Sequence, residues 1–435
     1  MVVSNLRAAL VIAVTWVAPG RWRGIARAPG PDYSPPTRQA KIPPLGGYTR
    51  VRLKSFGLNI LLALGAIVFA LIVLELLLRL MPSLMPEEAQ LRIHWRQMAN
   101  ADTARSLADP YLGFVYPANV RSTLVQTSVN FEFQMDSHGY RNLGPWPDHA
   151  DVVAVGDSWV FSYGVNDDET WSHQVERSLP GTRVMNLGLA GYGPEQYTRT
   201  YERVGIPLHP KVLLYGIFPG NDLEDTGVFQ SWVAAGSPGN YIRWRTRARV
   251  QQLNTPIVGK SYVVLLVRES WKNRRARFGS RTVTWGDGHH LRLAGDLYRK
   301  DARHAVPGDP EFEEAMAALE RARSLAAAQG TRVVVLLFPT KEEVYLPLLN
   351  HPVPQPLAAF AQELTRRKID FIDLSGPFTA QAKAGRSVYF ELDPHPNRLG
   401  YGIIARTVSD YLERNAAALG LTLTTPPPRS TTQTH

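Results

Sequence analysis

The longest apolar stretch of the chain lies near its N-terminus and predicts a membrane-spanning helix. Residues 56–78 read FGLNILLALGAIVFALIVLELLL, and Glu75 is the only ionisable side chain among these 23 residues. A helix of this length crosses the roughly 30 Å hydrocarbon core of a bilayer. Glu75 lies near the end of the stretch, and Arg79, four residues further on, can pair with it at the membrane interface. We therefore expect a transmembrane helix over residues 56–80.

Beyond residue 150 the apolar positions form short continuous runs, each followed by a turn rich in Gly, Asn or Asp. Continuous runs, as opposed to alternating ones, are typical of parallel strands that are buried on both faces. Strand, turn and helix, repeated five times, predict a doubly wound α/β domain over residues 150–415. The expected strands are residues 152–155, 183–187, 212–218, 333–338 and 371–374. The expected helices between them include residues 170–179, 196–204, 310–329 and 356–367.

Three further segments lie outside this repeat. Residues 81–149 predict a helical stalk followed by short extended pieces, one of them at 131–135. An insertion at about residues 224–310 interrupts the order of strands and helices. Residues 420–435 have no apolar face, so we expect this tail to be disordered.

The chain has a net charge of +10, and an excess of basic side chains is concentrated in two segments. Residues 1–54 hold nine basic side chains and one acid, a net +8. Because basic segments remain on the cytoplasmic side, we expect a cytoplasmic tail over residues 1–55 and an α/β domain in the periplasm or at the cell exterior. Residues 55–435 carry only +2, so the charge indicates no nucleic-acid partner. Within the insertion, residues 241–304 hold 15 basic and four acidic side chains, which favours anionic lipid headgroups, an acidic glycan or a solvated lid.

The chain has no cysteine, which excludes cysteine nucleophiles, thiolate-bound zinc, iron–sulfur clusters and disulfides. The candidate reactive groups follow the expected strands instead. Ser158, Gly191 and Asn221 each stand in a turn after a strand, and Asp393 and His395 precede an apolar helical segment. The carboxyl ends of parallel strands meet at one edge of a sheet, so these residues are expected to gather there.

Together these residues supply the parts of an acyl-transfer site. His395 can take the proton of the Ser158 hydroxyl, and Asp393 can orient the imidazole. The backbone N–H groups of Ser158 and Gly191 and the side-chain amide of Asn221 can donate to the oxyanion of a tetrahedral intermediate. The sequence thus predicts Ser158, His395 and Asp393 as the catalytic residues and Ser158, Gly191 and Asn221 as the oxyanion hole.

The motifs around these residues resemble those of the SGNH, or GDSL-type, hydrolase superfamily. They are Gly156-Asp157-Ser158, Asn186 with Gly191 five residues later, Pro219-Gly220-Asn221-Asp222, and Asp393 with His395. Their order agrees across residues 150–412. The resemblance implies a flavodoxin-like three-layer α/β/α fold with a five-stranded parallel sheet. It also implies activity on acyl esters or acetylated polysaccharides, with no cofactor and no metal, and supporting roles for Asp157 and Asn186.

One motif departs from the family pattern, because the family aspartate stands three residues before the histidine. Here Asp393 is only two residues before His395, and Leu392 occupies the family position. An alternative is therefore a Ser–His dyad with a backbone carbonyl as the orienting group. Among the other polar residues, we expect Lys341 to begin a solvated helix, and Asp287 with its neighbouring histidines to be an exposed loop without metal.

The preferred function is hydrolysis of acyl esters, with O-acetyl groups of a cell-envelope glycan, or a lipid, as the substrate. An O-acyltransferase that modifies an exported polysaccharide with the same residues is the first alternative. A non-catalytic scaffold that binds glycan or lipid is the second. We expect one helix to hold the chain in the membrane.

Overall fold

The computed structural model describes residues 48–86, 89–90, 93, 106–125, 129–245, 261–275, 281–293, 305–351 and 355–423. Most of the basic tail, much of the stalk, parts of the insertion and the last 12 residues lie outside the described residues. The chain divides between Ile67 and Val68 into two compact units.

The apolar stretch near the N-terminus forms one long helix, α2 (Tyr48–Leu80). Within it, Leu58–Leu80 has a mean hydropathy of 2.9, and none of the most apolar window is buried inside the protein. By length and composition this segment is able to cross a membrane.

A five-stranded parallel sheet forms the centre of the second unit, in the order β11-β10-β7-β5-β6. Every residue of β5 and β7 is buried, which explains why these strands read as continuous apolar runs. All five strands coincide with the expected ones to within one or two residues. Their bounds are β5 (Val152–Val155), β6 (Val184–Asn186), β7 (Val212–Ile217), β10 (Arg332–Leu337) and β11 (Asp370–Asp373).

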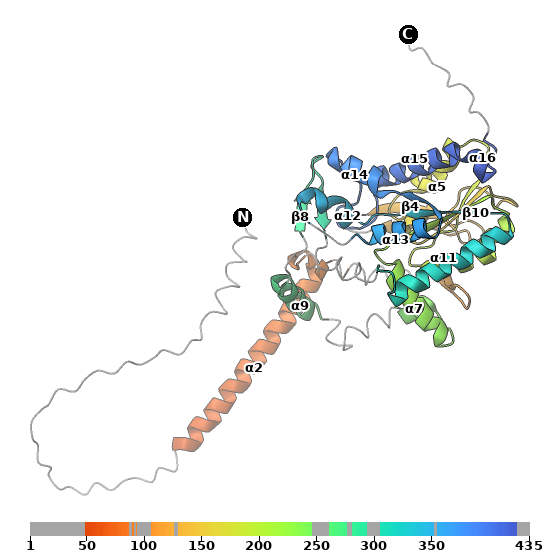
Figure 1. Cartoon of the computed structure of the whole chain (residues 1–435). Coiled ribbons are helices and arrows are strands. Elements are labelled where there is room, and N and C mark those ends of the chain that lie inside the picture. Colours follow the sequence, from red (N-terminus) through yellow and green to blue (C-terminus); the bar gives the residue numbers. More distant parts are fainter. Residues whose placement is uncertain are drawn as a thin grey trace, which may run out of the picture. The chain divides into compact units, whose positions relative to one another are not determined.

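Helices cover both faces of the sheet, so the fold has three layers (Figure 1). Alternate residues of a strand enter different cores, as Val153 and Ala154 of β5 do. One layer contains α6 (Pro194–Thr200), α7 (Asp222–Ala234), α11 (Pro310–Ala328) and α13 (Pro356–Arg366). The other contains α5 (Trp171–Ser178), α12 (Lys341–Tyr345), α14 (Ser375–Lys383) and α15 (Arg398–Arg414).

Two antiparallel hairpins precede the sheet, as the extended pieces in this region suggested. They are β1 (Leu107–Asp109) with β2 (Gly113–Val115), and β3 (Arg121–Val125) with β4 (Asn130–Gln134). The aromatic side chains of Phe114, Phe131 and Phe133 join the core on the α6 and α11 side of the sheet.

Parts of the insertion pack into the cores of the domain. Helix α7 packs against both α6 and α11, with Phe229 and Trp232 fully buried. A hairpin of β8 (Arg281–Thr284) and β9 (His290–Leu293) packs Leu291 and Leu293 into the core on the α15 side. Helix α9 (Tyr262–Arg275) lies between these elements in sequence.

Candidate active site

The candidate nucleophile stands at the first position of a short helix, and two residues separate it from the end of strand β5. Helix α4 (Ser158–Phe161) begins at Ser158, and the Asp157 carboxylate caps it by accepting the Trp159 backbone N–H at 2.8 Å. The other Asp157 oxygen lies 3.3 Å from the Ser158 hydroxyl oxygen. Asp157 therefore fixes the turn that presents Ser158.

Ser158, His395 and Asp393 form a continuous hydrogen-bonded relay. The Ser158 Oγ lies 2.6 Å from Nε2 of His395, and His395 Nδ1 lies 2.5 Å from Oδ1 of Asp393. These contacts favour the neutral His395 tautomer that carries its proton on Nδ1 and accepts a hydrogen bond at Nε2. In that tautomer His395 is able to accept the Ser158 proton.

The short Asp-x-His spacing has a structural explanation. Oδ1 of Asp393 also accepts the backbone N–H of His395 at 2.9 Å, so the carboxylate bonds both the main chain and the ring of the same residue. A carboxylate that reaches the N–H two residues ahead is an ordinary Asx turn. Asp393 thus occupies the orienting position that the alternative reading gave to a backbone carbonyl.

The relay is almost enclosed, with His395 6% and Asp393 4% exposed. Burial alone would raise the pKa of Asp393. The charge and hydrogen bonds of His395, together with the charge of Lys341, outweigh burial and hold that pKa below its ordinary value of 3.8. The Tyr163 ring lies against the imidazole, with ring centres 4.7 Å apart.

Lys341 begins helix α12, as expected, but its side chain is buried and not solvated, which corrects the expectation from the sequence. Its side chain crosses to the loop before His395 and donates to the carbonyls of Phe390 at 2.6 Å, Glu391 at 2.8 Å and Asp393 at 3.3 Å. Burial lowers the pKa of Lys341 from 10.5 to about 8. The ammonium group therefore holds the loop that carries Asp393.

The two other expected oxyanion donors, Gly191 and Asn221, are joined through Asp225 and Arg245. The Asn221 Nδ2 donates to Oδ2 of Asp225 at 2.8 Å. The Arg245 Nη1 donates to Oδ1 of the same carboxylate at 3.2 Å and to the Gly191 carbonyl at 2.6 Å. The insertion thus supplies a guanidinium group that braces both turns.

Gly191 occupies a position that only glycine fits well. Its φ angle is +86°, and an added Cβ would lie 2.8 Å from Nη1 of Arg245. The positive φ angle alone makes a side chain at this position costly, and an added Cβ would also displace the tip of the Arg245 side chain.

Asn186 holds the helix that contains the nucleophile. Its Nδ2 donates to the Val160 carbonyl at 2.7 Å, and its Oδ1 accepts the Gly188 N–H at 2.9 Å. The side chain of Asn186 therefore ties the end of β6 to helix α4, which contains Ser158.

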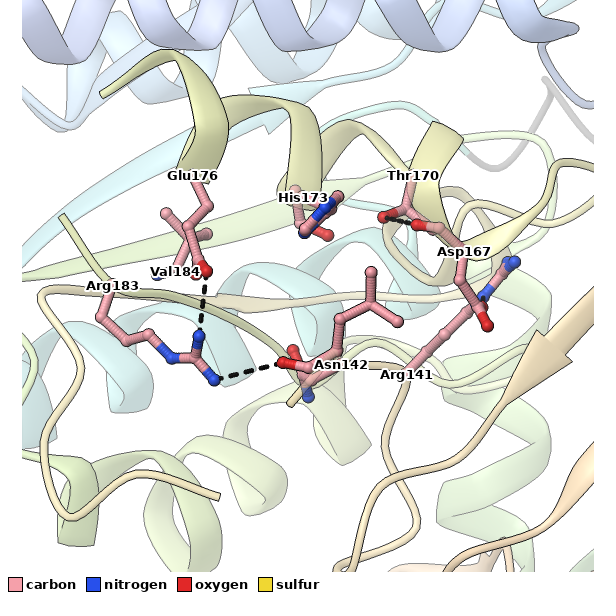
Figure 2. Close-up of a pocket in the computed structure, with 10 residues that line it drawn as sticks. Arg141, Asn142, Asp167, Thr170, His173, Glu176, Arg183 and Val184 are labelled. Carbon is pink, nitrogen blue, oxygen red and sulfur yellow. Dashed lines mark hydrogen bonds and ion pairs between the residues drawn. The ribbon is translucent and has the colours of Figure 1, made fainter. Parts of the chain in front are cut away.

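A buried arginine that the sequence did not single out holds the chain after α4. Arg141 donates to the carbonyls of Ser162 at 2.8 Å and Val165 at 2.5 Å, and it forms an ion pair with Asp167. Arg141 also lines the polar pocket in Figure 2, together with His173 and Thr170. Its volume of about 10 Å³ accommodates roughly one water molecule, so the pocket is too small for a substrate.

Within the described part of the chain, no group of three or more His, Asp or Glu side chains is arranged to hold a metal ion. Asp287 instead accepts the backbone N–H and the hydroxyl of Ser387. His289 and His290 are exposed on the β8–β9 hairpin, as expected.

Comparison with known families supports the resemblance for the part of the chain that contains Asp393 and His395. Residues 294–432 match a family described as "SGNH hydrolase-like domain, acetyltransferase AlgX". This C-terminal part of the chain is therefore similar to an SGNH hydrolase-like domain. The matched part includes Lys341, Asp393 and His395, and it ends well after the last sheet strand. No curated protein matches the sequence significantly.

Several solved structures resemble the chain at low identity. A member of the lipolytic G-D-S-L family from Veillonella parvula is 13% identical, with 60% of this chain and 98% of that chain covered and a TM-score of 0.34. The psychrotrophic esterase EstA of Pseudoalteromonas sp. is 10% identical, with 61% of this chain and 99% of that chain covered and a TM-score of 0.34. Axe2, an acetylxylan esterase of Geobacillus stearothermophilus, is 11% identical, with 65% of this chain and 100% of that chain covered and a TM-score of 0.33.

Proposed function

We propose that this protein is a serine-dependent enzyme that cleaves acyl esters, with O-acetyl groups of a cell-envelope glycan as the favoured substrate and a lipid ester as the other candidate. The observation that carries this proposal is the relay from Asp393 through His395 to the Ser158 hydroxyl. Packing of an apolar core does not require three polar side chains in a hydrogen-bonded row at the carboxyl ends of the strands, whereas acyl transfer does.

In the first step, Ser158 Oγ forms a bond to the carbonyl carbon while His395 Nε2 takes the hydroxyl proton. The carbonyl electron pair moves onto oxygen, and the bond to the leaving alcohol then breaks as His395 returns the proton to it. Water repeats the sequence on the acyl-serine and releases the acid. Asp393 stabilises the positive imidazolium and fixes its orientation throughout.

The oxyanion is held by the backbone N–H groups of Ser158 and Gly191 and by the Asn221 amide. One N–H of that amide is engaged by Asp225, which fixes the amide plane and leaves the second N–H for the substrate. Donors that are held in place before the reaction are each worth about 10²–10³ in rate.

Transfer of the acyl group to a glycan hydroxyl is the second candidate function. The observation in its favour is the family match, whose description names an acetyltransferase. The same residues serve both reactions, since only the acceptor for the acyl-serine differs.

We further propose that α2 crosses the membrane with its N-terminus in the cytoplasm. Residues 1–54 carry the positive charge that keeps this end inside. The domain that contains Ser158 would then face the periplasm or the cell exterior, where an envelope substrate is available.

The full chain in detergent micelles is sufficient to test the enzymatic proposal. We expect a fluorophosphonate probe to label the wild type and the Ser137→Ala control, in which an exposed serine is changed, but not Ser158→Ala. Hydrolysis of p-nitrophenyl acetate should be lost in the same variant. Labelling of Ser158 without hydrolysis, restored to turnover by an added oligosaccharide, would identify the transferase. Absence of both labelling and turnover would favour the non-catalytic scaffold.

A further inference from the structure

The end of the apolar helix α2 is hydrogen-bonded to the start of α9, although Glu75 and Tyr262 are 187 positions apart in sequence. The Glu75 carboxylate accepts the backbone N–H groups of Tyr262 at 3.0 Å and Val263 at 2.9 Å, and the Ser261 hydroxyl at 2.8 Å. These N–H groups belong to the first turn of α9 and would otherwise lack partners within the helix. Glu75 thus caps α9, and Arg79 pairs with the same carboxylate.

Apolar packing strengthens this junction on one side of α9. Leu265 is 5% exposed and packs with Leu78 of α2 and with Met85. Tyr262 lies under the Arg79 guanidinium, 4.8 Å from the ring centre. The side of α9 that faces α2 is therefore fixed by both polar and apolar contacts.

The outward side of α9 is also apolar, and it is exposed. Val267 and Trp271 are four residues apart, so they share a face, and they are 63% and 55% exposed. The second half of the helix is basic in sequence, with Arg268, Lys272, Arg274 and Arg275 against the single acid Glu269. Apolar side chains that include a tryptophan, next to several basic residues, are typical of helices that lie in a membrane interface.

The position of the junction along α2 fits that interpretation. Glu75 lies five residues before Leu80, where the membrane-spanning segment ends. At 1.5 Å per residue the start of α9 is then about 7.5 Å below that end. Interfacial helices bury their apolar face by roughly 5–10 Å, which is the same depth.

We propose that α9 is an interfacial helix, which inserts Val267 and Trp271 into the bilayer next to α2 and places its basic residues against anionic lipid headgroups. The proposal rests on the membrane anchor proposed for α2, and it is independent of the chemistry at Ser158. The protein would then contact the membrane twice, through α2 and through helix α9 of the insertion.

The chain has no native cysteine, so single cysteines can be labelled without background. We would attach a nitroxide to Val267→Cys or Trp271→Cys in the full chain, reconstituted in nanodiscs with phosphatidylglycerol. Collision with oxygen reports lipid, and collision with a nickel chelate reports water. We expect both labels to favour oxygen, as Ile67→Cys inside α2 should. Val125→Cys, exposed on the β3 strand, should favour nickel.

Each contrary result has a separate meaning. If the Ile67 label favours oxygen while the two α9 labels favour nickel, the anchor stands and the interfacial helix is refuted. If the Ile67 label also favours nickel, the anchor itself is refuted. Spectral broadening between labels at Val267 would show that a second copy of the chain covers this face, which would also overturn the proposal.

Two further comparisons test the forces involved. Replacing phosphatidylglycerol by phosphatidylcholine should shift the Trp271 label towards nickel, because the attraction between the basic residues and the headgroups is lost. Glu75→Gln should shift both α9 labels in the same direction while leaving the Ile67 label unchanged. If the change of lipid caused no shift, the proposed attraction to the headgroups would be wrong. If Glu75→Gln caused no shift, the proposed role of the Glu75 cap would be wrong.

Discussion

Replacement of Lys341 by methionine tests how a buried charge supports the candidate active site. The change removes an ammonium group that donates to three carbonyls of residues 390–393. Methionine has a similar length and keeps the apolar part of the side chain in its burial site. The loop then loses its anchor next to Asp393 while the surrounding packing is retained.

The effect on stability depends on pH in a defined direction. Burial lowers the pKa of Lys341 from 10.5 to about 8 in the folded chain. Between these values the unfolded chain still binds a proton that the folded chain has released, so the free energy of unfolding rises with pH. Since one pKa unit corresponds to 1.36 kcal/mol, the rise attributable to Lys341 is about 3 kcal/mol between pH 8 and pH 10.5.

Urea unfolding at several pH values in that window measures this contribution. We expect the free energy of unfolding of the wild type to rise by about 3 kcal/mol relative to Lys341→Met as the pH increases. Lys383→Met, which changes an exposed lysine of α14, should run parallel to the wild type. If the Lys341→Met and wild-type curves were also parallel, the burial argument would be wrong.

The same variant should affect catalysis through the position of Asp393. A displacement of about 1 Å in a supporting group can cost roughly 10²-fold in rate. We therefore expect Lys341→Met to lower kcat for p-nitrophenyl acetate by about 10- to 100-fold at neutral pH, with KM little changed. An unchanged kcat would mean that the loop is held without this ammonium group.

Three other substitutions probe the relay and the oxyanion donors, each measured as ester hydrolysis by the full chain. Asp393→Asn should lower kcat by about 10⁴-fold without loss of folding, because an amide favours the wrong imidazole tautomer; a loss below tenfold would support the dyad. Asn221→Ala should cost about 10²–10³-fold in kcat, and no loss would remove it from the oxyanion hole. Arg245→Met should lower kcat, whereas Arg245→Lys should recover part of it; equal losses in both would argue against the shared brace to Gly191 and Asp225.

The strands and the central residues of the site were predictable because local sequence carries their signal. Strands β5 and β7 are buried on both faces, so their residues form continuous apolar runs that end at the turns of Ser158 and Asn221. The order of the motifs then indicated that His395 and Asp393 would meet Ser158, and these three side chains are in contact.

The supporting residues were not predictable, because their partners lie far away in sequence. Lys341 is followed by two glutamates at the start of a helix, a pattern that is typical of a solvent-exposed segment. Only the folded chain brings Lys341 against residues 390–393. Arg245 lies in a basic stretch, where nothing distinguishes it from its neighbours until Asp225 and Gly191 are placed beside it. Most of helix α7 falls within residues 224–310, where the sequence predicts an insertion and not a helix of the α/β repeat.

The most direct test of the central proposal is to locate the acyl group on the enzyme. The full chain would be mixed with p-nitrophenyl acetate, quenched in acid within the first turnovers, digested and mapped by mass spectrometry. We expect acetylation of the peptide that contains Ser158 in the wild type, and its absence in Ser158→Ala and in His395→Ala. Acetylation at another residue, or turnover that persists in Ser158→Ala, would contradict the assignment of Ser158 as the nucleophile.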